Sequence, residues 1–152
     1  MTRAAALLVA ALAASVSAPF SAPVAAQPAG FAEAMDEVLT PTGAAAPMLR
    51  CAGLYRAFRL LAGEETGVGA EALEGEVALA LAAAARRESD TGASPAAAMA
   101  EIAPVIAAAS QLYLDRMGAA RAATGNAMED GLEATLFACA ELRAVLAGVA
   151  GG

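Results

Sequence analysis

Residues 47–62 read PMLRCAGLYRAFRLLA, and this stretch decides the fold class. Its larger apolar residues recur every three or four positions, which is the spacing of one face of an α-helix. Pro47 is tolerated in a first helical turn, and Gly63 follows as a joint. The residues on this apolar face are Met48, Cys51, Leu54, Tyr55, Phe58 and Leu61, with Arg50, Arg56 and Arg59 off it. We therefore predict a core helix over 47–62.

The same spacing recurs on both sides of this helix. It predicts further helices over about 31–39, 70–88 and 94–123, and a last helix that ends near 146. Two capping pairs are equally good starts for this last helix, Asn126 with Glu129 and, one turn later, Asp130 with Glu133. Ala, Leu, Glu, Arg and Met dominate these segments and favour helix, and no run of residues alternates with the period of a strand. The expected fold is all-α, a small helical bundle of four to five helices. We expect a signal peptide over 1–26, an N-terminal segment with one short helix over 27–46, the helical bundle over 47–148 and a flexible tail over 149–152.

Particular side chains are expected to face the core. In helix 70–88 these are Leu73, Val77, Leu81 and Ala84, and in the last helix Leu132, Leu136, Cys139, Leu142 and Leu146. Ser94 followed by Pro95 is a typical helix start, and Pro104 is expected to kink or divide the helix that follows. The alanine tracts lie beside larger apolar residues in helical register, which predicts close helix–helix contacts.

Composition excludes several function classes. All 9 basic residues are Arg, His is absent, and the formal net charge of the 152 residues is -7. Without His there is no imidazole metal site and no His-based catalytic triad; without Lys there is no Schiff-base chemistry and no phosphate-loop lysine. An acidic chain with scattered Arg is also a poor nucleic-acid binder, because phosphate neutralisation is the main source of that affinity.

The N-terminus has the order of a secretory signal peptide. A basic start at Arg3 precedes an uncharged Ala/Leu/Val run, and small residues follow at 24–26. We expect cleavage between Ala26 and Gln27, since a cut after Ala18 or Ala22 would place proline directly after it. The alternative, a membrane anchor, needs roughly 18 consecutive apolar residues, and this run is shorter. The protein is expected to be periplasmic or secreted, with no stable membrane span after cleavage.

Cys51 and Cys139 are the two cysteines. In an exported protein an even cysteine count predicts oxidation, so we expect a Cys51–Cys139 disulfide that places helix 47–62 against the last helix. The alternative is two buried free thiols, which pack as small apolar side chains.

The charged and polar candidates each have a structural explanation. Glu64, Glu65, Glu71, Glu74 and Glu76 could act as paired carboxylates, but a solvated acidic surface is the preferred interpretation, and calcium-loop spacing is absent. The run 86–90 could bind an anion, although cations at a helix C-terminus are favoured by the helix dipole.

A polar cluster of Tyr113, Arg116 and Asp130 is expected to hold the last two helices together, because a buried tyrosine hydroxyl needs a partner. No nucleophile or base stands beside it, and the serines lack an activating residue and the G-x-S-x-G motif.

These observations predict no catalytic residue, no metal site and no cofactor. The expected function is a non-enzymatic interaction, structural or small-ligand-binding module, whose partner is an unknown protein or a small apolar ligand. An alternative is a periplasmic stress-responsive holdase, whose carboxylates would neutralise at acid pH and loosen a small core. A carboxylate-dependent hydrolase is the third hypothesis.

Overall fold

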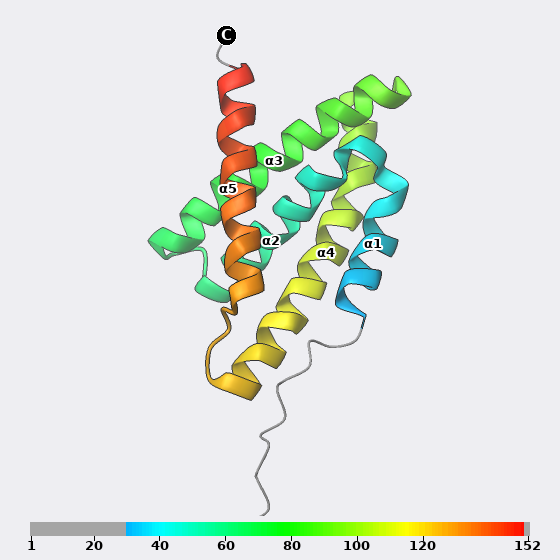
Figure 1. Ribbon diagram of the computed structural model, residues 1–152. Helices are drawn as coiled ribbons and strands as arrows, with labels where there is room; N and C mark the ends of the chain where they lie inside the picture. Colours follow the sequence, from blue (N-terminus) through cyan, green and yellow to red (C-terminus); the bar gives the residue numbers. More distant parts are fainter. Residues whose placement is uncertain (1–29, 151–152) are drawn as a thin grey trace, which may run out of the picture.

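The computed structural model describes residues 30–150, so the expected signal peptide and the Ala26–Gln27 cleavage site lie outside the described residues. The elements in order are α1 (Phe31–Leu39), the 3-10 segment η1 (Thr40–Ala45), α2 (Ala46–Ala62), α3 (Gly67–Thr91), α4 (Pro95–Thr124) and α5 (Asp130–Ala150) (Figure 1). Helices α1 to α4 pack together, and α5 lies at one side against α2 and α3. The all-α fold is confirmed.

Helix ends follow the local sequence signals. Ser94 caps α4 as expected, because its Oγ accepts a hydrogen bond from the N–H of Ala97. Gly92 and Gly125 end α3 and α4 with φ of 71° and 79°, a left-handed conformation that glycine adopts without a side-chain clash. Pro104 was expected to kink or divide α4; the helix is continuous through it, so it is not divided.

Small residues let the central helices approach closely. A Cβ added at Gly53 of α2 would stand 2.7 Å from the Cβ of Ala109 on α4, and one added at Gly75 of α3 would stand 2.9 Å from the ring of Tyr55 on α2. A larger residue would require α2 and α4 to move apart at Gly53, and would require the Tyr55 ring to shift at Gly75. The expectation that alanine tracts form close helix–helix contacts is confirmed at the crossing of Gly53 with Ala109.

The prediction for the inner face of α3 was wrong. Leu73, Val77 and Leu81 are 43%, 48% and 58% exposed, and only Ala84 of the expected set is buried. The buried face consists of Gly69, Ala72, Gly75, Leu79, Ala80, Ala83 and Ala84. Close backbone approach selects small residues for this contact, and the larger apolar residues then fall on the outer face of the helix. Periodicity identified the helix but assigned its sides wrongly.

Helix α5 is held to the rest of the bundle by the expected crosslink. Cys51 on α2 and Cys139 on α5 form a disulfide with a Cα–Cα distance of 5.3 Å, and both residues are buried. Leu132 is the other fully buried residue on α5, whereas Leu136, Leu142 and Leu146 are half-buried. The disulfide is confirmed, and it is typical of an oxidising, extracytoplasmic compartment.

Helix α4 is long and apolar enough to span a membrane by length and composition alone. In the structure it packs against α1, α2 and α3, with Ile102, Ile106 and Tyr113 buried. Many of its exposed positions are alanines. Burial against these helices therefore accounts for part of the apolar character of α4.

Candidate functional site

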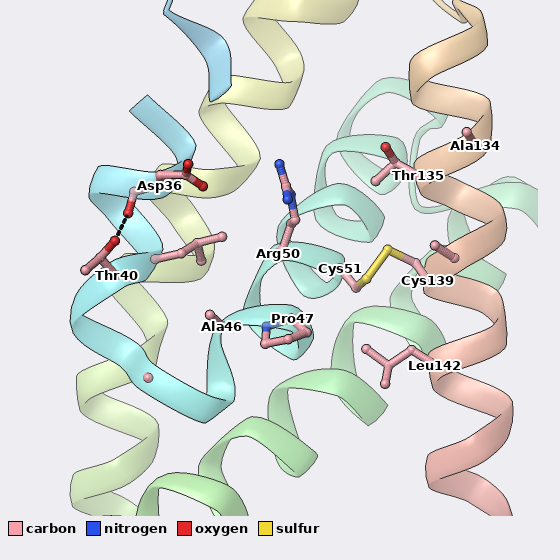
Figure 2. Close-up of a pocket in the computed structure, with 13 residues that line it drawn as sticks. Asp36, Thr40, Ala46, Pro47, Arg50, Cys51, Ala134, Thr135, Cys139 and Leu142 are labelled. Atoms are coloured by element: carbon pink, nitrogen blue, oxygen red, sulfur yellow. Dashed lines mark hydrogen bonds between the residues drawn. A yellow bond between two sulfur atoms is a disulfide. The ribbon is translucent and has the colours of Figure 1, made fainter. Parts of the chain in front are cut away.

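A cleft of about 780 Å³ lies between the α1–η1 segment and α5, with α2 as its floor (Figure 2). The apolar part of its lining consists of Leu39, Gly43, Ala46, Pro47, Ala134, Ala138, Leu142 and the Cys51–Cys139 disulfide. Its polar part consists of Asp36, Thr40, Arg50 and Thr135. The volume falls in the usual range of ligand pockets, roughly 300–1,000 Å³.

Arg50 is the cation of this cleft, and it projects from α2 into the space between α1 and α5 (Figure 2). Its Nε is buried and makes no hydrogen bond within residues 30–150. Apart from Arg50 and the exposed Arg121, every arginine in the described part of the chain lies within 4.0 Å of a carboxylate oxygen. A half-buried guanidinium without an anion is costly, because it has lost water without gaining a counter-charge.

The two walls contribute side chains whose hydrogen bonds are already partly used. On α1, the carbonyl of Asp36 accepts a hydrogen bond of 2.6 Å from Thr40 Oγ1, while the Asp36 carboxylate faces the cleft (Figure 2). On α5, Thr135 Oγ1 donates to the carbonyl of Gly131 at 2.7 Å, which leaves its lone pairs free to accept. The cleft therefore presents one cation, one carboxylate and otherwise apolar or neutral surface.

Tyr113 lies beneath this site on α4 and is buried. Burial raises the pKa of the Tyr113 hydroxyl, and the positive charges of Arg50 and then Arg116 offset part of that rise. The hydroxyl has no hydrogen-bond partner among the described residues. Arg50 and the unpartnered Tyr113 hydroxyl therefore lie close together beside the cleft, whereas the charge of Arg116 is compensated by Glu129.

The expected cluster of Tyr113, Arg116 and Asp130 is arranged around a different acid. Arg116 pairs with Glu129, the residue before Asp130, and its guanidinium carbon stands 4.6 Å from the ring centroid of Phe31. Phe31 in turn packs on Tyr113 with ring centroids 5.4 Å apart. Asp130 begins α5, where a carboxylate is favoured by the helix dipole. The cluster ties α1, α4 and the α4–α5 connection together.

The carboxylates of residues 64–76 are largely engaged in ion pairs. Arg59 Nε donates to Glu76 at 2.8 Å, which raises the pKa of the guanidinium, and Arg59 also pairs with Glu64. Arg143 on α5 lies 3.5 Å from Glu74 on α3. These contacts join α2, α3 and α5. The expected solvated acidic surface is therefore wrong for Glu76, because both side chains of the Arg59–Glu76 pair are only 13% exposed. Within residues 30–150 no group of three or more Asp, Glu or Cys side chains is placed to hold a metal ion.

The arginines at the end of α3 also have partners. Arg86 Nε donates to Asp90 at 3.1 Å, four residues on, and Arg87 pairs with Glu101 of α4. Their charges are therefore met within the protein, in contrast to that of Arg50.

A smaller apolar groove of about 330 Å³ lies between α2, α3 and α5. Its lining consists of Tyr55, Phe58, Val68, Glu71, Ala72, Leu136, Phe137 and Ala140. Glu71 is its one charged residue, and it stands on the exposed rim. The larger cleft is the better candidate site, since it combines an apolar lining with an inward-facing charge.

No family model matches this chain, and neither a search of curated proteins nor one of solved structures found a match. The site therefore has to be interpreted from its own geometry.

The sequence pattern did not indicate Arg50, Asp36 or Thr135 as site residues. One signal for Arg50 was present, because α2 carries three arginines and no acidic residue. Arg56 and Arg59 obtain a carboxylate from Glu76 of α3, but no acid in the described residues reaches Arg50. Which of the three remains unpaired depends on tertiary packing, which the sequence pattern does not contain.

Proposed function

We propose that the chain is an exported, non-enzymatic module that binds a small, largely apolar ligand in the cleft between α1–η1 and α5. The observation that carries the proposal is the cleft itself, with a volume of about 780 Å³ and a mainly apolar lining. A ligand bound there would remove apolar surface of both the ligand and the protein from water, and each Å² buried would stabilise the complex by roughly 25 cal/mol.

The absence of a reactive constellation in the cleft supports a binding role over a catalytic one. Both cysteines of the lining are joined in the disulfide, and Asp36 and the threonines have no activated nucleophile beside them within the described residues. The disulfide, together with the signal-peptide pattern of residues 1–26, supports a periplasmic or secreted location.

The experiment is a fragment screen by thermal shift and NMR on the oxidised mature protein. Ala138→Trp should fill the cleft and abolish the stabilisation by fragments that bind there, because Ala138 lines it. Ala144→Trp is the matched control, since Ala144 is exposed on the same helix and outside the cleft lining. A screen in which no fragment binds, or in which all bound fragments ignore Ala138→Trp, would refute the proposal.

A second candidate function, a holdase, is favoured by one observation. Leu73, Val77 and Leu81 form an exposed apolar row on the outer face of α3. Such a row suits contact with apolar segments of unfolded proteins. The protein would then suppress aggregation of an acid-unfolded client at mildly acidic pH, and replacing all three residues by Ser would abolish that effect. An unchanged suppression after this replacement would remove the candidate.

A further inference from the structure

We propose that the ligand of the cleft is a small carboxylate, and that Arg50 binds its carboxyl group. This inference rests on the proposed function, because it names the chemical class of the ligand for the same cleft. It assigns to Arg50 the role of charge recognition and to the apolar walls the role of holding the ligand's hydrocarbon part.

Arg50 lacks a counter-charge in the described part of the protein. Its Nε is buried without a hydrogen-bond partner in residues 30–150, and no carboxylate oxygen of that part of the chain lies within 4.0 Å of its guanidinium. The planar guanidinium offers parallel N–H donors that match the two oxygens of a carboxylate. A carboxylate bound in the cleft would supply the missing counter-charge and would accept hydrogen bonds from the terminal nitrogens of Arg50.

The position of Arg50 within the cleft also suits a carboxylate. Figure 2 shows it between the two walls, with the disulfide on one side of it and Asp36 on the other. The remaining surface is formed largely by Leu39, Pro47, Leu142 and small residues of α5. A ligand anchored by its carboxylate at Arg50 can therefore lay an apolar chain or ring along the disulfide and Leu142.

Asp36 is the carboxylate that shares the cleft. It is exposed on α1 and forms no ion pair with Arg50 within the 4.0 Å limit that the other pairs meet. The negative charge of Asp36 repels an anion that enters the cleft. Removing that charge should strengthen the binding of a carboxylate, whereas it would weaken the binding of a cationic ligand.

The test compares octanoate with octanamide, a neutral analogue of the same length, by NMR titration of the oxidised mature protein. Octanoate should bind at the cleft, and octanamide should bind about tenfold more weakly or worse, because it lacks the charge-assisted hydrogen bonds. Arg50→Gln should weaken octanoate binding by a similar factor and leave octanamide binding nearly unchanged. Arg50→Lys should fall between wild type and Arg50→Gln.

Arg121→Gln is the matched control, because it removes one positive charge from an exposed arginine outside the cleft lining and should leave octanoate binding unchanged. Asp36→Asn should strengthen octanoate binding about twofold or more, which tests the inference even if Arg50→Gln is poorly folded. Equal binding of both probes, no loss in Arg50→Gln or no binding of either probe overturns the inference. If neutral fragments nevertheless bind to the wild-type protein and lose that binding in Ala138→Trp, the proposed function is retained.

Discussion

Reduction of the Cys51–Cys139 disulfide should both destabilise the protein and release α5 from the bundle. The two cysteines are 88 residues apart, and closing a loop of that length removes chain entropy from the unfolded state worth about 4.6 kcal/mol. Strain and residual structure in the reduced unfolded chain lower this value, so we expect a loss of roughly 2–5 kcal/mol.

The structure indicates where the loss appears first. Helix α5 contributes Leu132 and Cys139 as its fully buried residues, whereas α2 and α4 carry most of the buried core. On reduction, α5 should therefore open while α1 to α4 retain their packing. Since α5 forms one wall of the cleft, opening of this helix should also weaken ligand binding.

The assay is urea unfolding with and without dithiothreitol, followed by amide hydrogen exchange of the reduced protein. The control is the double variant Cys51→Ala, Cys139→Ala, whose unfolding should not respond to the reductant. An unchanged unfolding midpoint on reduction, or α5 amides as slow to exchange as those of α4, would refute the reasoning.

Three further outcomes are expected. Gly53→Ala should destabilise by about 1–3 kcal/mol because the new Cβ meets Ala109, whereas Gly118→Ala, where the space is open, should stabilise by roughly 0.5–1 kcal/mol; urea midpoints of the two variants check this. Because burial raises the pKa of Tyr113 above its ordinary value of 10.0, stability should be full below about pH 10 and fall as the pH rises through the folded pKa; Tyr113→Phe should reduce that alkaline loss in thermal unfolding scans, and an unchanged pH profile would count against it. Intact-mass measurement of the exported protein should show an N-terminus at Gln27, and retention of the first 26 residues would contradict the signal-peptide assignment.

The sequence predicted the elements that large apolar residues define. The spacing of Leu54, Tyr55 and Phe58 located α2, and the placement of Cys51 and Cys139 on two apolar faces predicted which helices touch. Both inferences succeeded because Leu54 and Tyr55 are buried in the core, and because a disulfide requires a short Cα separation.

The faces of α3 could not be predicted in the same way. Hydrophobic spacing predicts that Leu73, Val77 and Leu81 face the core. The close contact with α2 is instead made by small residues such as Ala72 and Gly75. The advantage of a small residue is close backbone approach, which is a property of two helices together. The sequence of a single helix therefore does not indicate which of its faces approaches another helix closely.

The candidate site was also beyond the sequence pattern. Arg50 differs from Arg56 and Arg59 by the lack of a nearby carboxylate, which depends on where α3 crosses α2. The polar cluster was found in part, since Tyr113 and Arg116 do meet around Phe31. Its acid is Glu129 and not Asp130, because the path of the connection between α4 and α5 determines which of these two neighbouring acids reaches Arg116.

The most direct measurement of the central claim is a crystal structure of the oxidised mature protein with octanoate. We expect the carboxylate within about 2.7–3.1 Å of the terminal nitrogens of Arg50, and the hydrocarbon chain against Leu142 and the disulfide. Octanoate bound outside the cleft, or a cleft that stays empty while Arg50 pairs with a carboxylate of the protein itself, would contradict the account.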